Sequence, residues 1–312
     1  MNKTILITGA AGFTGRHFID LALRNGYRCV SLFHKEQHKA FGNENVTDVE
    51  SGAEGIVADL TDKAQLKAKI AEVAPDMVVH LAAVSFVAHA DVSDIYRTNL
   101  LGTINLLDSL IELNLPLDKV LLASSGNVYG NTTQLPIHEG LAAAPANDYG
   151  VSKYAMEMAA QIRFERLPII ITRPFNYTGI GQAEHFVVPK IVAAYQRGER
   201  SIELGNLDVA RDFSDVRDVV GAYLKLLQSD VKTGLFNLCS NKATSLLEVI
   251  EQLNTLAGYQ MQINVNPAFV RDNEIKTLYG DNQKLTDVIG QYQHHQLSDT
   301  LKWMFQAGQR SE

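Results

Sequence analysis

Short apolar runs alternate with longer amphipathic stretches from the start of the chain, and this rhythm limits the fold more than any other feature. Continuous runs of Ile, Val and Leu are typical of parallel strands, which are buried on both faces. Strand–helix alternation predicts a doubly wound parallel sheet, a Rossmann-like α/β fold. The expected strands are residues 4–8, 27–33, 55–58, 77–81, 120–123 and 168–172. The expected helices are residues 13–25, 62–73, 93–113 and 148–166.

The rhythm loosens after residue 173, where turn-rich stretches such as 198–206 separate the elements. This change predicts two domains, residues 1–175 and a smaller mixed α/β domain over residues 176–312 that covers the carboxyl edge of the sheet. Residues 212–238 are expected to return to the first domain. The elements expected in the second half are helices at 186–196 and 216–228 and strands at 235–238 and 260–265.

Charge and composition exclude several classes of function. The chain carries a formal net charge of −7, whereas nucleic-acid and membrane-surface binders need clustered Lys and Arg. Cys29 and Cys239 lie in apolar runs and are expected to be buried reduced thiols, so no disulfide or zinc pattern arises and no metal site is predicted. We find no signal-peptide pattern and no run of about 18–20 apolar residues that could span a membrane. This composition predicts a cytoplasmic protein.

A glycine-rich segment, TGAAGFTGR at residues 8–16, follows the first expected strand and opens the first expected helix. Gly9 permits the tight turn, Gly12 lets the backbone approach a pyrophosphate, and Gly15 lets helix and strand pack closely. The phosphates would lie at the helix N-terminus, where free N–H groups and the helix dipole favour anions. The segment therefore predicts that the first domain binds a dinucleotide.

A second motif, Y-x-x-x-K, begins the helix expected at residues 148–166. Tyr149 and Lys153 are four residues apart, so their side chains lie on one helix face. The phenol of a tyrosine in water has a pKa of about 10, and a lysine ammonium beside it would lower that pKa. Such a pair can transfer a proton to or from an alcohol or sugar oxygen while a nicotinamide transfers hydride. The two motifs together predict an oxidoreductase.

The spacing G-x-x-G-x-x-G, combined with Y-x-x-x-K, resembles the extended short-chain dehydrogenase/reductase family. The resemblance covers nearly the whole chain and implies that residues after the third and fourth strands contact the adenine and the nicotinamide ribose. It also implies that Asn99 shapes the central helix, and that Ser125, with Ser124 as the alternative, is the third catalytic residue beside Tyr149 and Lys153. The cofactor contacts implied are Gly9, Gly12, Phe13, Thr14, Gly15, Arg16, Asp59, Leu60, Leu81, Ala82, Ala83, Asn99, Tyr149 and Lys153.

The end of the second expected strand decides between the two nicotinamide dinucleotides. An NAD enzyme usually carries Asp or Glu there to hold the ribose 2′-hydroxyl, whereas this chain has Phe33 followed by His34 and Lys35. These two residues, with Arg16 as a further candidate, would suit a 2′-phosphate. The sequence therefore favours NADP(H), with NAD(H) as the alternative.

The second half carries segments that resemble those of nucleotide-sugar enzymes: RPFNYTG at 173–179, FVVPK at 186–190, ARDFSDVRD at 210–218, and RDNE at 271–274 followed by GDNQKL at 280–285. The resemblance implies that Asn176 and Arg211 bind the diphosphate of a nucleotide-sugar substrate. Asp272 stands where the family has proline, which departs from the pattern. The substrate contacts implied are Ser85, Asn127, Asn176, Val188, Lys190, Arg211, Arg271 and Glu274.

Within the nucleotide-sugar branch, we expect a reductase that uses NADPH on the C4 ketone of a GDP- or dTDP-linked 4-keto-6-deoxyhexose. Related dehydratases carry acids beside the catalytic serine, where this chain has Gly126 and Asn127, so no dehydration is expected. The alternative is a nucleotide-sugar 4-epimerase with tightly bound NAD. The intact Ser–Tyr–Lys set speaks against a non-catalytic dinucleotide sensor. The helices at 93–113 and 148–166 resemble the pair through which family members form homodimers.

Overall fold

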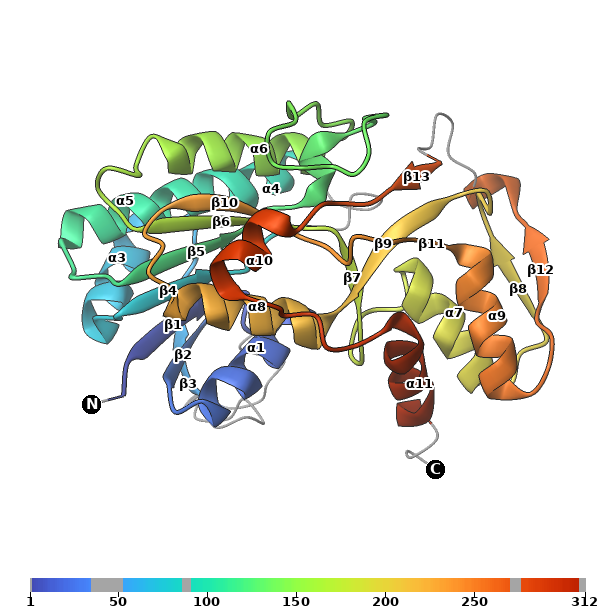
Figure 1. Ribbon diagram of the computed structural model, residues 1–312. Helices are drawn as coiled ribbons and strands as arrows, with labels where there is room; N and C mark the ends of the chain where they lie inside the picture. Colours follow the sequence, from blue (N-terminus) through green and yellow to red (C-terminus); the bar gives the residue numbers. More distant parts are fainter. Residues whose placement is uncertain (1, 35–52, 86–90, 270–275, 309–312) are drawn as a thin grey trace.

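Seven parallel strands form the central sheet of the computed structural model, which describes residues 2–34, 53–85, 91–269 and 276–308 (Figure 1). The strand order is β10-β6-β5-β4-β1-β2-β3. Starting from β1, the chain adds β2 and β3 on one side and then β4 and the later strands on the other side. Parallel sheets of this kind bind ligands at such a switch point, which here lies between β1 and β4. The strands are β1 Thr4–Thr8, β2 Arg28–Phe33, β3 Glu54–Val57, β4 Met77–His80, β5 Lys119–Ala123, β6 Ile169–Pro174 and β10 Gly234–Leu238.

Helices cover both faces of the sheet (Figure 1). Helices α1, α8 and α10 pack on one face through a buried core that includes Phe18 and Val219, and α3, α5 and α6 pack on the other through Leu66 and Leu107. This two-sided burial explains the continuous apolar runs of the strands. The helices are α1 Phe13–Arg24, α3 Lys63–Val73, α4 Val92–Tyr96, α5 Thr103–Leu113, α6 Asp148–Gln161, α8 Val216–Gln228 and α10 Gln283–Ile289.

Two of the expected helices differ from the structure in their interior or their end. The helix expected at 93–113 contains a π-helical turn, η1 Arg97–Gly102, between α4 and α5. Wide turns of this kind are frequent at functional sites, and this one contains Asn99. Helix α6 ends at Gln161, five residues before the expected end at 166. Ile162 is 80% exposed there, so no buried apolar face stabilises a longer helix.

The second half of the chain packs around its own core, beyond the central sheet (Figure 1). Helices α7, α9 and α11 surround a two-stranded sheet of β8 and β12, and β9 pairs with β7, β11 and β13. The stretch at 198–206 expected to be turns contains strand β8, in which exposed and buried residues alternate. These elements are β7 Asn176–Thr178, α7 Val187–Gln196, β8 Ser201–Leu204, β9 Ala210–Asp215, β11 Ala243–Ser245, α9 Leu246–Ala257, β12 Gln262–Val265, β13 Thr277–Leu278 and α11 Leu297–Gly308.

Helix α8 and strand β10 lie with the first sheet. Strand β10 pairs in parallel with β6, and α8 packs in the same core as α1. Residues 212–215 belong to β9 and thus to the smaller sheet. The division of the chain at residue 175 stays a prediction.

No helix in the described part of the chain is long and apolar enough to cross a membrane. Both cysteines are buried and not joined in a disulfide.

Candidate active site

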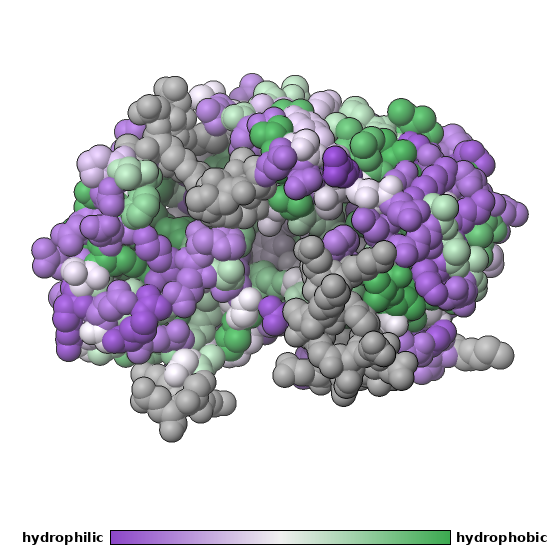
Figure 2. Space-filling model, turned by 180° about the vertical axis from the view of Figure 1, so that it is seen from behind, coloured by the Kyte–Doolittle hydropathy of each residue, from purple (hydrophilic) through white to green (hydrophobic). Residues whose placement is uncertain are grey.

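A pocket of about 380 Å³ lies between the carboxyl ends of the central strands and the second half of the chain. Figure 2 shows a hollow between these two parts of the molecule. The volume falls within the range of small-molecule sites, ~300–1,000 Å³. One wall comes from the glycine loop and the residues that follow β4, β5 and β6, and the other from residues 186–189, Phe213 and Leu278.

The glycine loop after β1 fits the pyrophosphate of a dinucleotide. Gly9 has a φ of +70°, and a Cβ there would lie 2.6 Å from the backbone nitrogen of Ala82. A Cβ on Gly15 would lie 2.4 Å from the Gly9 carbonyl oxygen, so α1 can pack on the loop only without a side chain here. Gly12 begins α1 without a side-chain cap, and the first turn carries no acid. The residues of this turn line the pocket, where their N–H groups can donate to an anion.

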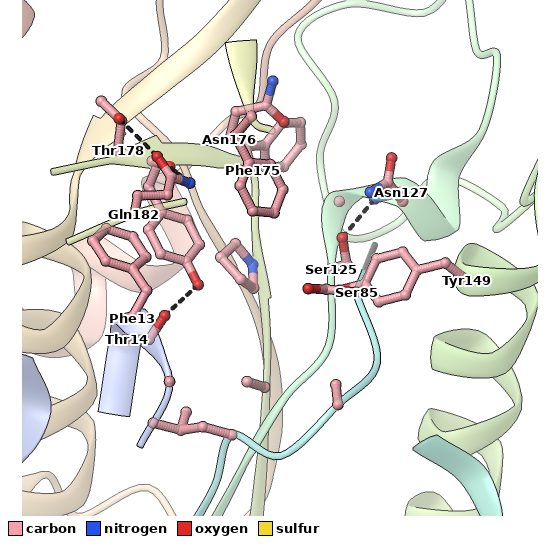
Figure 3. A pocket seen from close by; sticks show the side chains of 18 of the residues that line it. Phe13, Thr14, Ser85, Ser125, Asn127, Tyr149, Phe175, Asn176, Thr178 and Gln182 are labelled. Atoms are coloured by element: carbon pink, nitrogen blue, oxygen red, sulfur yellow. Dashed lines mark hydrogen bonds between the residues drawn. The ribbon is translucent and has the colours of Figure 1, made fainter. Parts of the chain in front are cut away.

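Tyr177 joins the glycine loop to the second half of the chain. Its hydroxyl shares a hydrogen bond of 2.7 Å with the Thr14 hydroxyl, and its ring stacks on Phe13 with ring centres 5.9 Å apart (Figure 3). All three residues line the pocket. The sequence singles out the RPFNYTG segment but not the role of this tyrosine within it. Its partner Thr14 is 163 residues away in the chain, so the local spacing of residues does not indicate the contact.

The three residues predicted to be catalytic line the same pocket. Ser125 follows β5, and its hydroxyl accepts a hydrogen bond from the Asn127 N–H at 3.1 Å (Figure 3). Tyr149 and Lys153 lie one turn apart on α6. The Lys153 Nζ donates to the Ala123 carbonyl at 2.7 Å and lies 6.0 Å from the centre of the Tyr149 ring. The fold therefore brings the three side chains together from β5 and α6.

Ser124, the alternative to Ser125, has a different partner. Its hydroxyl donates to the buried carboxylate of Glu157. The Ser125 hydroxyl instead interacts with the Tyr149 phenol, and this hydrogen bond lowers the pKa of the phenol. The geometry therefore supports Ser125 as the hydroxyl that meets the reacting oxygen.

Burial dominates the ionisation of the Tyr–Lys pair. It raises the pKa of Tyr149 above its usual value, nearby Tyr177 adds to this, and the hydrogen bond with Ser125 opposes it. Burial also lowers the pKa of Lys153 to about 8, against the attraction of Glu157. The expected lowering of the tyrosine pKa is therefore not seen in the protein alone. Tyr149 is a phenol near neutral pH, ready to donate a proton.

Asn99 acts behind the pocket rather than in it. Its amide oxygen accepts from the Val84 N–H at 2.8 Å, and its Nδ2 donates to the Val84 carbonyl and to Ser152. It thereby fixes the segment after β4 against α6. Asn99 does not line the pocket, and its predicted cofactor contact stays a prediction, whereas Leu81 and Ala83 on the same segment do line the pocket.

His80 helps to hold the segment after β4 in place. The Ala82 N–H donates to the Thr8 hydroxyl, which lies 2.7 Å from His80 Nδ1, and His80 Nε2 lies 2.8 Å from the Thr103 hydroxyl. The Thr103 proton goes to the Asn99 carbonyl, so Nε2 carries the imidazole hydrogen and Nδ1 accepts. Burial, with Lys153 nearby, lowers the pKa of His80 to about 3, so the ring is neutral.

The substrate side of the pocket contains part of the predicted set. Ser85, Asn127, Asn176 and Val188 line it, together with further residues that were not predicted individually, although most lie in the segments 173–179, 186–190 and 210–218. Figure 3 shows Phe175 and Asn176 between the catalytic side and the side of Phe13 and Gln182. Some of the additional residues directly follow β6, a position that could have indicated them, whereas Gln182 and Leu278 lie outside the segments singled out in the sequence. The additional lining residues are Pro174, Phe175, Tyr177, Thr178, Gln182, Phe186, Val187, Pro189, Phe213 and Leu278.

Other predicted residues do not line the pocket. Among the described residues these are Arg16, His34, Asp59, Leu60, Ala82, Lys190 and Arg211. The His34 Nε2 lies 3.6 Å from the Asp59 carboxylate, at the ends of β2 and β3. Arg211 shares a strand face with Phe213, two residues further on, which does line the pocket. The predictions for Lys35, Arg271 and Glu274 lie outside the described residues.

The Lys190 ammonium is engaged in contacts within the second half. Its Nζ donates to the Glu203 carbonyl at 2.8 Å and lies 4.5 Å from the centre of the Phe269 ring. A Cβ on Gly205 would lie 2.1 Å from the Phe269 carbonyl oxygen, so the absence of a side chain there permits this close packing. The predicted base contact of Lys190 stays a prediction.

A dinucleotide loop at the switch point of a parallel sheet, with Ser125, Tyr149 and Lys153 in the same pocket, defines an NAD(P)-dependent oxidoreductase of the short-chain type. The family model for GDP-mannose 4,6 dehydratase matches residues 6–304, and the chain belongs to this family of extended short-chain dehydrogenases/reductases.

Three similar proteins bear on the reaction. The GDP-6-deoxy-D-talose 4-dehydrogenase of Aggregatibacter actinomycetemcomitans is 34% identical over 92% of this chain and 91% of its own length. The GDP-6-deoxy-D-mannose reductase of Pseudomonas aeruginosa is 37% identical over 69% of this chain and 74% of its own length. The structure of RMD from Pseudomonas aeruginosa complexed with NADPH matches all of both chains with a TM-score of 0.80 and 28% identity.

Proposed function

We propose that this enzyme uses NADPH to reduce the C4 ketone of a GDP-linked 4-keto-6-deoxyhexose to a 6-deoxy sugar nucleotide. The names of the two relatives place GDP-linked 6-deoxyhexoses at the centre of their activities, which favours GDP over dTDP for this chain. One relative is named for a talose and the other for a mannose, so both configurations at C4 are candidate products.

The observation that carries the proposal is that the pocket contains Ser125, Tyr149 and Lys153, while the neighbouring positions 126 and 127 hold no acid. A Cβ on Gly126 would lie 3.3 Å from the Phe175 ring, so that ring would have to shift to admit any side chain there. Asn127 lines the pocket and cannot transfer a proton near neutral pH. Glu139 accepts a hydrogen bond from the Asn237 N–H at 2.7 Å and does not line the pocket. Elimination of water across C5 and C6 needs such groups, whereas reduction of an already dehydrated sugar does not.

The residues of the pocket supply the proton chemistry of this reduction. When bound, the cofactor supplies hydride to the ketone carbon. The C=O electron pair then moves onto the oxygen, which takes the phenolic proton of Tyr149 while Ser125 holds that oxygen by a hydrogen bond. Lys153 stabilises the phenolate that remains, and solvent returns the proton. The raised pKa of Tyr149 suits this direction, because the phenol is protonated before each turnover.

The N-terminus of α7 provides a place for the substrate diphosphate. Phe186 precedes the helix without a side-chain cap, and its first turn carries no acid. This turn lines the pocket together with Asn176. The N–H groups of Val187 and Val188 at this terminus favour an anion, whereas Pro189 has no N–H, and the Asn176 amide can add a donor. Arg211 shares a strand face with the pocket residue Phe213, a position from which it would add a charge-assisted hydrogen bond.

The end of β2 supports NADPH as the cofactor. Phe33 is buried in the core, so His34 is the residue that faces outward after the strand, and neither is an acid. The similar RMD structure contains NADPH. We expect a higher kcat/KM with NADPH than with NADH, and replacement His34→Asp should reduce this ratio. A parent enzyme that uses NADH equally well would contradict the preference.

The test of the proposed function is turnover of GDP-4-keto-6-deoxy-D-mannose with NADPH, followed by the nicotinamide absorbance. NMR of the product gives the configuration at C4. GDP-mannose with NADP⁺ serves as the control and should lose no water. Interconversion of nucleotide sugars without consumption of NADPH would instead identify a 4-epimerase.

A further inference from the structure

A buried ion pair lies one helical turn beyond Lys153 and takes no part in the proton transfer described above. Glu157 is fully buried and Arg173 is 3% exposed. The Arg173 Nε and Nη2 donate to the two carboxylate oxygens of Glu157 at 2.9 and 2.6 Å. Because desolvation cancels much of the attraction in buried ion pairs, stability alone is a weak reason for this one.

The contacts of Glu157 link three elements of the active site. The Ser124 hydroxyl donates to Glu157. The Lys153 ammonium donates to the carbonyl of Ala123, the residue before Ser124. Helix α6 therefore holds two successive residues at the end of β5 through contacts one turn apart. Arg173 extends this connection to β6. Ser125 follows directly, so its place relative to α6 depends on these contacts.

We propose that Glu157 is a positioning residue that fixes the end of β5 against α6 and keeps Lys153 in its charged form. In the described part of the chain, the titratable groups around Lys153 are Tyr149 and Glu157 on its own helix and His80 on β4, while Arg173 on β6 is paired with Glu157. His80 is neutral and Tyr149 is protonated, so the carboxylate of Glu157 is the charge that favours the Lys153 ammonium.

The direction of the effect follows from these charges. Burial already lowers the pKa of Lys153 to about 8, and Glu157 opposes this lowering. An opposite charge at close range raises the pKa of a cation by about 1 to 3 units, so loss of Glu157 should lower that pKa further, by about one unit. Lys153 would then lose its proton within the neutral range.

The informative variant neutralises both partners. Glu157→Gln alone leaves a buried guanidinium without its partner and risks unfolding. Glu157→Gln/Arg173→Gln removes both charges, while the new amide oxygen can still accept from Ser124. NMR of protein labelled at the lysine ε-carbon, with Lys153→Met to assign the signal, gives the pKa of Lys153 without any substrate. This readout stands even if the proposed substrate is wrong.

We expect the Lys153 signal of the double variant to titrate below that of the parent, by less than the loss of Glu157 alone would give because the Arg173 charge is removed as well, with a parallel shift of the alkaline limit of reduction. The control is Arg163→Gln/Asp108→Asn, a partly buried pair whose Nη2–Oδ1 distance is 2.7 Å and which does not line the pocket. Its Lys153 titration should equal that of the parent. An unchanged titration in the folded double variant would overturn the electrostatic role.

Ser124→Ala tests the positioning role and keeps the ion pair. It should lower kcat about tenfold with little change in the KM of the sugar, because about 1.4 kcal/mol of alignment is lost in the transition state alone. An unchanged kcat would overturn the positioning role. This variant also keeps the proposal testable if the double variant does not fold.

Discussion

In the proposed reduction, the phenol of Tyr149 supplies the proton that the reaction consumes. We expect Tyr149→Phe to lower kcat at least a hundredfold, within the range of general-acid contributions of ~10²–10⁴. Dinucleotide affinity should remain within a factor of a few, because Gly12 and the first turn of α1 are unchanged. Single-turnover kinetics and NADPH titration measure the two effects separately, and turnover within tenfold of the parent would contradict the role of this residue.

The ionisation of Lys153 should set the alkaline limit of the reaction. Its pKa lies at about 8, below its usual value, so the ammonium is lost as the pH rises through 8. Tyr149 has a raised pKa and keeps its proton over this range. The rate of reduction should therefore be constant below about pH 7.5 and fall above pH 8 with the loss of one proton. A rate that is flat to about pH 10 would show that the charge on Lys153 is not required.

The shared pocket position of the three candidate catalytic residues could be predicted because their signals are local: a strand end for Ser125 and a four-residue spacing for Tyr149 and Lys153. The contacts that tune them could not. Glu157 is an ordinary acid in a helix until the fold places Arg173 beside it, and only the fold shows that burial dominates the pKa of Tyr149.

Helix α1 and the glycine loop pack too closely for any side chain at position 15. Gly15→Ala should abolish dinucleotide binding and lower the free energy of unfolding by about 1–3 kcal/mol, because a Cβ would lie 2.4 Å from the Gly9 carbonyl oxygen. Gly221 lies within α8 with nothing within 4 Å of its Cβ position. Gly221→Ala should therefore raise the free energy of unfolding by about 0.5–1 kcal/mol. Urea unfolding and NADPH titration of both variants give the comparison.

Most strands of the first sheet could be predicted from their apolar runs, since a strand that is buried on both faces is apolar at nearly every position. Strand β8 was missed because four residues near a glycine resemble a turn until β12 pairs with them. The π-helical turn around Asn99 was missed because an extra residue in one turn hardly alters the apolar pattern of the long helix.

The molecule as a whole exposes apolar residues on the helices predicted to form a homodimer. Leu101 in η1 is 52% exposed and Val151 on α6 is 39% exposed. We propose that a second copy covers this surface, and expect Leu101→Glu to convert a dimer into a monomer of 34.4 kDa in sedimentation experiments. Leu247 on α9 is 49% exposed, and Leu247→Glu serves as the control that should remain dimeric. A parent protein that sediments as a monomer would contradict this proposal.

We expect the hydrogen bond between Thr14 and Tyr177 to make the binding of the dinucleotide and of the sugar nucleotide thermodynamically interdependent. It joins the glycine loop, where we expect the dinucleotide, to strand β7, beside which we propose the sugar nucleotide. Whichever ligand binds first should order this contact for the other, and the gain in affinity must be equal in both directions. Calorimetry with NADP⁺ and a GDP-linked sugar can measure that gain. Tyr177→Phe, which keeps the ring but removes the hydroxyl, should reduce it by about 1 kcal/mol, roughly fivefold in affinity.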